Sequence, residues 1–110
     1  MVDAPVPDAP RAKRETGTPT DGVGPVLQCG SAANAVIAAI ESMNAHVELL
    51  DRAAYVRVLV PERCVVTRAA IESALGRPFR LPGDLEAIMS SFKGRFRVTD
   101  DEATWEFARR

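Results

Sequence analysis

Residues 23–43 read VGPVLQCGSAANAVIAAIESM, and this segment carries the strongest signals for secondary structure in the chain. Residues 23–27 predict a short strand, and Pro25 has no backbone N–H for a sheet ladder, which favours a sheet edge or a strand start. Ser31 is then expected to cap a helix, and Asn44 is expected to end it. Apolar residues at helical spacing define the buried face of that helix: Ala33, Val36, Ile37, Ile40 and Met43.

Two strands are expected after this helix, at residues 47–51 and 54–60. Three valines, Val56, Val58 and Val60, occupy alternate positions in the second of them, which is the period of a strand with one buried face. Residues 22–60 are therefore predicted to form a βαββ half.

The second half, residues 61–110, is predicted to be βααββ. A short strand at residues 64–66 precedes a helix that Thr67 caps and that Gly76 ends. A second helix is expected to open at residues 82–84 and to end at Gly94. Its apolar face would consist of Leu85, Ile88, Met89 and Phe92.

A hairpin of residues 95–99 and 104–107 is expected to complete the fold. Phe96 and Val98 should share the core face with Trp105 and Phe107, because directly paired residues lie on the same face of a sheet. A three-residue loop would pair Val98 with Thr104 and Phe96 with Glu106, which places core residues opposite residues of the solvent face. We therefore expect a four-residue loop at 100–103, which pairs Val98 with Trp105 and Phe96 with Phe107.

The domain organisation follows from composition. Residues 1–21 carry many prolines and charges and few large apolar side chains, so this segment is expected to be a flexible N-terminal tail. Residues 22–110 are expected to form one α+β domain with antiparallel or mixed sheets packed on three helices, and the free protein is expected to be a monomer.

The charge pattern excludes several classes of function. A net charge of −1 lacks the basic footprint typical of nucleic-acid binding. The stripe of Lys93, Arg95 and Arg97 alternates with aromatic residues that should point into the core, so a solvated strand face is the better interpretation.

No apolar run is long enough to span a membrane, and no secretion leader is expected. Two cysteines suggest a reduced pair in the cytoplasm.

A catalytic or metal-binding set is not expected. His46, Cys29 and Cys64 are the only imidazole and thiol ligands in the sequence, and their spacing matches no zinc or diiron motif. One histidine would have to serve any catalytic triad, and no nucleophile-elbow motif accompanies it. These features predict a protein that acts by binding rather than by catalysis, with no cofactor.

Four motifs together carry a resemblance to a known family. They read VGPVL from residue 23, DRAAYVRV from residue 51, LGRPF from residue 75 and SSFKGR from residue 90. In this order and spacing they resemble the effector (coupling, regulatory) proteins of bacterial multicomponent diiron monooxygenases. The nearest subgroup is that of the toluene, alkene and isoprene monooxygenases.

The resemblance implies a non-catalytic, cofactor-free protein that binds the diiron hydroxylase component. It would tune active-site geometry, substrate access and the coupling of NADH and O2 use to hydrocarbon oxidation. By position, the resemblance places Ile88, Ser90, Ser91 and Phe92 against the hydroxylase. The alternative docking region surrounds Val23 and Ser31. The alternative function is a free-standing α+β regulatory or RNA-binding module, and a small enzyme is the third class.

Overall fold

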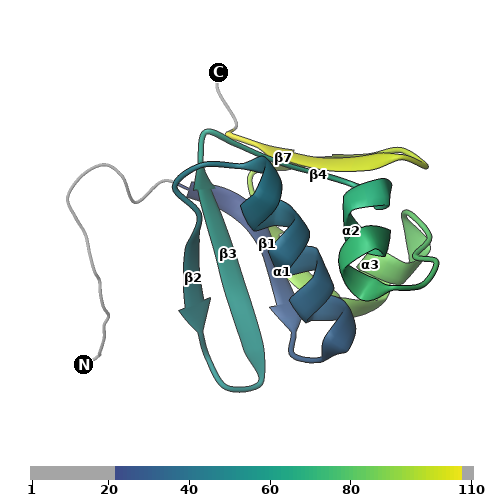
Figure 1. The fold of residues 1–110 in the computed structure, drawn as a ribbon. Helices are drawn as coiled ribbons and strands as arrows, with labels where there is room; N and C mark the ends of the chain where they lie inside the picture. Colours follow the sequence, from purple (N-terminus) through teal and green to yellow (C-terminus); the bar gives the residue numbers. More distant parts are fainter. Residues whose placement is uncertain (1–21, 108–110) are drawn as a thin grey trace.

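A computed structural model describes residues 22–107 of the chain, so the predicted tail at 1–21 lies outside the described residues. The strands form two antiparallel sheets, with the orders β2-β3-β1-β5 and β4-β7-β6 (Figure 1). The elements are β1 (Gly22–Gln28), α1 (Ser31–Met43), β2 (Glu48–Asp51), β3 (Tyr55–Pro61), β4 (Arg63–Thr67), α2 (Arg68–Leu75), α3 (Gly83–Ile88), β5 (Met89–Lys93), β6 (Arg95–Val98) and β7 (Glu102–Glu106). The predicted α+β class is confirmed.

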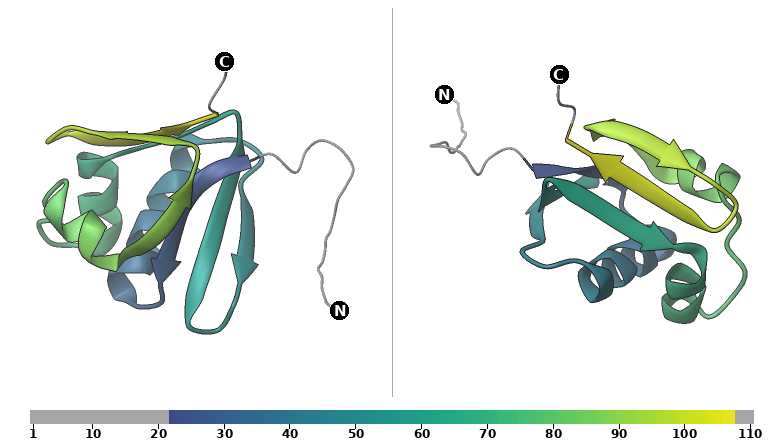
Figure 2. Two further views of the ribbon diagram at one scale, coloured as in Figure 1. Left: turned by 180° about the vertical axis from the view of Figure 1, so that it is seen from behind. Right: turned by 90° about the horizontal axis from the view of Figure 1, so that it is seen from above.

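The core lies where the two sheets and α1 meet. Helix α1 covers one face of the four-stranded sheet, and the three-stranded sheet crosses one end of that layer (Figures 1 and 2). The largest fully buried side chains come from both sheets and from all three helices: Trp105, Leu27, Ile40, Ile71 and Leu85. No helix lies over the opposite face of the four-stranded sheet among the described residues, as the view from behind shows (Figure 2).

Strand β1 is an interior strand, which corrects the expectation that Pro25 marks a sheet edge. It lies between β3 and β5, and its pairing with β3 is interrupted at Gly24 and Pro25. The missing N–H of Pro25 falls within this interruption. Gly24 has φ of 150°, and a Cβ there would overlap the carbonyl oxygen of Val58, so only glycine lets the two backbones approach here.

Helix α1 has the predicted end but a different start. Gly30, not Ser31, occupies the N-cap position, and no side chain caps the helix. At the other end Asn44 joins the helix to the second sheet. Its Nδ2 donates to the carbonyl oxygens of Ile40 and Val65, each at 2.8 Å, and its Oδ1 accepts from Val65 N at 3.1 Å.

Helix α2 begins and ends as predicted. The Thr67 hydroxyl accepts a hydrogen bond from Ala70 N at 3.1 Å, which satisfies one of the free N–H groups at the helix start. Gly76 follows the helix in the left-handed conformation, with φ of 81°, the usual glycine stop.

The prediction of one helix from residue 82 to Gly94 is wrong in its second part. Helix α3 ends at Ile88, and the chain continues as β5, which pairs with β1. The apolar period seen in the sequence is real, but Leu85 alone of α3 is fully buried. The open edge of β1 provides backbone hydrogen-bond partners that a longer helix would leave unsatisfied. The second half is therefore βααβββ.

The hairpin exists, but its register and loop differ from the prediction. Phe96 lies opposite Trp105 and Val98 opposite Ala103. The loop is a tight turn at Asp100 and Asp101, closed by a 2.9 Å hydrogen bond from Thr99 N to the Glu102 carbonyl oxygen. The two-residue loop also keeps the core residues on one face. Phe107 lies beyond the last residue pair of this hairpin and is 42% exposed. The predicted burial of Trp105 is confirmed.

Gly94 forms the corner between the two sheets. It joins β5 of the four-stranded sheet to β6 of the three-stranded sheet. Its φ is 103°, and a Cβ there would lie 2.7 Å from the Glu106 carbonyl oxygen and 2.8 Å from Val23 Cγ1. The chain can therefore turn from one sheet to the other in a single residue only if that residue has no side chain.

Candidate functional site

The candidate residues Ser90, Ser91 and Phe92 lie on β5, an edge strand. Within residues 22–107, β5 pairs with β1 alone, so the outer backbone groups of β5 face away from the sheet. Both serines are exposed, and Phe92 is 45% exposed. Ile88, the last residue of α3, is half-buried against the core. The edge strand therefore exposes small polar side chains and one large aromatic ring.

Ser91 belongs to a row of residues that crosses the uncovered sheet face. It lies opposite Val26 on β1, Val26 lies opposite Arg57 on β3, and Arg57 lies opposite Leu50 on β2. Directly paired residues share a face, and this face is the one opposite α1, because Leu27 on the alternate side is fully buried. Ser90 Oγ is 3.5 Å from the Val26 carbonyl oxygen, which ties the strand to the same part of the sheet.

Phe92 is supported from beneath by two further aromatic rings. The ring centroids of Phe92 and Phe96 are 5.3 Å apart, and those of Phe96 and Trp105 are also 5.3 Å apart in a stacked arrangement. Exposure falls along this series, from 45% at Phe92 to zero at Trp105. The exposed ring is thus held by packing on a buried one, which limits the entropy that it would lose on binding.

The structure does not bring the other two candidates to this edge. The Val23 side chain is fully buried and contributes to the core, so Val23 is unsuitable as a contact residue and that candidate is corrected. Ser31 is exposed at the start of α1, where it lines a groove of about 270 Å³ between α1 and α2 together with Asn34, Ala38 and Ala74. Ser31 belongs to the α1–α2 side of the molecule.

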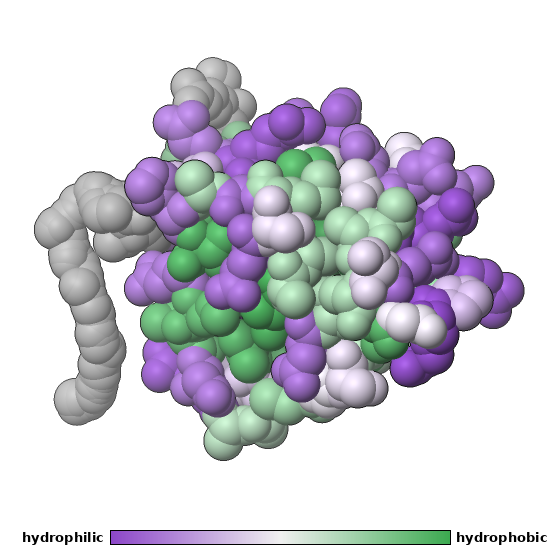
Figure 3. All heavy atoms as spheres, in the orientation of Figure 1, coloured by the Kyte–Doolittle hydropathy of each residue, from purple (hydrophilic) through white to green (hydrophobic). Residues whose placement is uncertain are grey.

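A second apolar surface lies beside α1 on β2 and β3. Figure 3 shows apolar side chains gathered over these strands on the face that α1 covers in part. Leu49 is 39% exposed and lies opposite Val58 of β3, and Ile37, Val47 and Val56 are half-buried and pack against the core. This surface was not singled out in the sequence. The signal that could have identified it is the pair Leu49 and Leu50 within β2, together with a helix α1 that has one charged side chain, Glu41.

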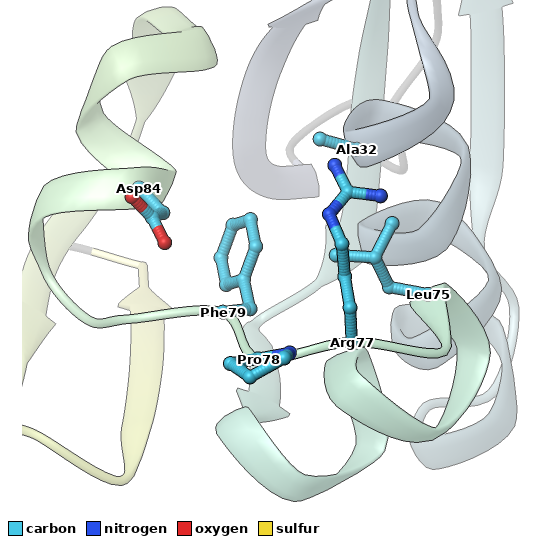
Figure 4. Close-up of a pocket in the computed structure, with 6 residues that line it drawn as sticks. All are labelled: Ala32, Leu75, Arg77, Pro78, Phe79 and Asp84. Carbon is cyan, nitrogen blue, oxygen red and sulfur yellow. The ribbon is translucent and has the colours of Figure 1, made fainter.

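The pocket in Figure 4 has no catalytic arrangement. It encloses about 230 Å³ between the start of α1, the end of α2 and the start of α3. Phe79, Pro78 and Leu75 form apolar walls, and Arg77 and Asp84 provide the charged groups. Asp84 already accepts a 2.7 Å hydrogen bond from Arg80 N through Oδ2. That carboxylate therefore helps to hold the turn before α3.

The thiol and imidazole groups are far from a catalytic arrangement in the described part of the chain. Burial raises the pKa of Cys64 to about 12, so this thiol stays protonated at neutral pH. The exposed Cys29 donates from Sγ to the Ala53 carbonyl oxygen at 3.1 Å. Among residues 22–107 no group of three His, Cys, Asp or Glu side chains could hold a metal ion. None of the described helices is long and apolar enough to cross a membrane.

The comparison with protein families identifies this chain. Residues 21–106 match the model of the MmoB/DmpM family. The chain belongs to the MmoB/DmpM family. It is also 46% identical over 87 residues to the effector subunit of the alkene monooxygenase system of Xanthobacter autotrophicus, and the match covers 77% of this chain and 85% of the relative. The resemblance seen in the sequence motifs is confirmed.

Solved structures show the same fold as this MmoB/DmpM protein. Two chains from structures of a phenol hydroxylase–regulatory protein complex superpose with TM-scores of 0.69 and 0.65, at 22% and 24% sequence identity. They cover 79% and 77% of this chain, and 98% of each matched chain is covered. The relatives are named effector and regulatory proteins, and this MmoB/DmpM member is a regulatory component rather than an enzyme.

The sequence suggested Ser90, Ser91 and Phe92 as candidates, but it did not predict their structural setting. In this MmoB/DmpM protein they belong to a strand edge and not to a helix end. The row of residues through Val26 and Arg57 could not be predicted either, because it forms only when β5 pairs with β1. The available signal was the short SSFK run before Gly94, since serine is a weak helix former and Phe92 suits a strand.

Proposed function

We propose that this protein is the effector subunit of a multicomponent monooxygenase and that it binds the diiron hydroxylase component. The observation that carries this proposal is its membership of the MmoB/DmpM family, together with 46% identity to an alkene monooxygenase effector subunit. The regulatory proteins in the solved complexes belong to phenol hydroxylase assemblies, which supports a hydroxylase as the partner.

The proposed action is to tune the hydroxylase rather than to carry out its chemistry. The effector would change active-site geometry and substrate access, and would thereby couple NADH and O2 use to hydrocarbon oxidation. Such an effect requires the effector to bind one hydroxylase state more tightly than another. A shift from 1:99 to 99:1 between two states needs a preference of about 10⁴-fold, so the docking contacts must distinguish the two states strongly.

The β5 edge is the proposed docking surface. Ser90 and Ser91 are exposed and small, so a partner backbone can approach the strand closely. Phe92 offers a pre-positioned aromatic ring beside them, and buried aromatic anchors carry much of the binding energy in protein interfaces. Ile88 positions the start of the strand through its contact with the core.

We further propose that residues 22–110 act as one domain and that the free protein is a cytoplasmic monomer. A single cluster of buried residues drawn from both sheets supports the first point. Two unpaired cysteines support a reducing compartment. Light scattering of the purified chain checks the monomer, and a dimer at micromolar concentration would contradict it.

The test of the docking surface is the double variant Ser90→Gln/Ser91→Gln. Both side chains are exposed, so the variant should melt within a few degrees of the wild type. In a reconstituted assay with hydroxylase and electron-transfer components, product formation per NADH should fall, or the product distribution should shift. Bulky glutamines would block the close approach of the partner.

The matched control is Ser42→Gln/Ser73→Gln, which changes two exposed serines on α1 and α2. It should support wild-type turnover and coupling. A loss of coupling in this control, with normal activity of the Ser90/Ser91 variant, would move the docking surface to the α1–α2 side near Ser31. A wild-type protein that leaves hydroxylase turnover and coupling unchanged would overturn the effector proposal itself.

A further inference from the structure

The charge of the β5–β6 corner has the opposite sign to the charge of the protein. Residues 89–99 contain Lys93, Arg95 and Arg97 and no acidic residue, whereas the whole chain has a net charge of −1. All three cationic side chains are exposed. Lys93 lies on β5, and Arg95 and Arg97 lie on β6 beyond the turn at Gly94. Figure 2 shows the two strands meeting at this corner.

Asp100, Asp101 and Glu102 follow this segment in the sequence, and two of the nearby carboxylates pair with cations of other elements. Asp101, in the hairpin loop, lies 3.7 Å from the Arg68 guanidinium through Oδ1, and its carbonyl oxygen accepts from Arg68 N at 2.7 Å. Glu106 lies opposite Arg95 in the sheet, but its Oε2 pairs with Arg63 Nε at 3.3 Å. These pairs direct two carboxylates toward α2 and β4.

The sheet beside β5 adds a further cation. Arg57 is half-buried on β3, in the same row as Ser91 and on the uncovered face. Neighbouring residues of a strand face opposite ways, so Lys93 shares this face with Ser91 and Arg57, whereas Phe92 faces the other way and packs on Phe96. The edge strand and its corner therefore offer cations on one side and an apolar ring on the other, and interfaces combine apolar anchors with charged groups at their margins.

We propose that this cationic rim, formed by Lys93, Arg95, Arg97 and Arg57, recognises an acidic surface of the hydroxylase, while Phe92 on the other face of the same edge strand enters an apolar pocket. The inference rests on the proposed function, which supplies the partner, and adds the chemistry by which that partner is recognised. The rim attracts the acidic surface over distances of about one Debye length and speeds association. Phe92, once seated, slows dissociation.

The experiment measures association and dissociation rates of the full chain with the cognate hydroxylase at several salt concentrations. Lys93→Gln/Arg97→Gln should associate about five- to tenfold more slowly than the wild type at about 0.05 M salt. The difference should fall below about twofold at about 0.5 M salt, where screening shortens the electrostatic range to roughly 4 Å. Phe92→Ala should instead dissociate about tenfold faster or more and associate at nearly the wild-type rate.

The control is Arg77→Gln/Arg80→Gln, which removes the same charge from two exposed positions between α2 and α3. It should reproduce the wild-type rates at every salt concentration. Equal rates for Lys93→Gln/Arg97→Gln and the wild type would overturn the cationic rim and leave the effector function intact. Binding of a mixed-sequence single-stranded RNA at about 0.15 M salt, lost in the same variant, would reassign the rim to nucleic acid. A wild type that binds no hydroxylase would overturn the proposed function.

Discussion

Strands β5 and β6 follow each other with one residue between them, yet they have different roles. In β6 the side chains alternate, with Phe96 and Val98 half-buried and Arg95 and Arg97 exposed. In β5 four of the five residues are exposed. The difference arises from their neighbours, because β6 pairs with β7 over the core whereas β5 closes the edge of the other sheet. Stability should therefore depend on the half-buried residues of β6, and partner binding on β5 and the exposed arginines of β6.

The largest expected loss of stability is at Trp105, opposite Phe96. Trp105→Ala should lower the free energy of unfolding by about 3–5 kcal/mol, because the side chain is fully buried. Trp105→Phe should cost less, since Trp105 Nε1 is buried without a hydrogen-bond partner in the described structure and phenylalanine removes that N–H. Urea denaturation measures both. A Trp105→Ala variant as stable as the wild type would show that the β6 side does not carry the core.

The corner itself should be the next most sensitive position. Gly94→Ala forces a side chain into a left-handed backbone and against the Glu106 carbonyl oxygen, so we expect a loss of about 1–3 kcal/mol. Gly83→Ala is the matched control, because a Cβ there meets nothing within 4 Å. It should leave the unfolding midpoint unchanged or raise it slightly. Equal midpoints for the two variants would contradict the turn geometry.

Two phenylalanines on either side of Gly94 compare the strands directly. Phe96→Ala should destabilise the protein by about 2 kcal/mol more than Phe92→Ala, because Phe96 packs between Phe92 and Trp105 whereas Phe92 is 45% exposed. Denaturation of both variants under one set of conditions gives the difference. A larger loss at Phe92 would mean that β5 is a structural strand and would weaken its assignment as a docking surface.

The smallest expected effect concerns the two thiols. Cys64 lies opposite Trp105 in the core and Cys29 lies beyond the end of β1. A thiol reagent at pH 8 should modify Cys29 within minutes and Cys64 only after unfolding, because burial raises the pKa of Cys64 to about 12.

The raised pKa of Cys64 also makes the stability of the protein depend on pH. The folded state favours the protonated Cys64 thiol, so its contribution to stability is present below the ordinary pKa of 9.0 and is lost as pH rises from there toward about 12. A Cys64→Ala variant provides the control for this window. Rapid modification of both thiols in the folded wild type would contradict the burial of β4.

Much of this fold could be predicted from the sequence, because its signals are local. Thr67 and Gly76 delimit α2 through a side-chain cap and a left-handed stop, and neither depends on distant residues. The three valines of β3 alternate as a strand with one buried face requires. The absence of a metal-ligand motif and the four family motifs can also be read from residue types and spacing alone. Residue order by itself is therefore enough to predict the class of this protein.

The tertiary structure decided the features that depend on pairing between distant segments. Residues 89–93 satisfy a helical apolar period, yet they form β5 because β1 has an open edge to receive them. The hairpin register depends on which loop lets Phe96 face Trp105, and both two- and four-residue loops keep the core residues on one face. Strand pairing likewise decides that Val23 faces the core and that Ser91 faces the surface. Backbone hydrogen bonds in a sheet join residues far apart in the chain, so periodicity within one segment cannot determine them.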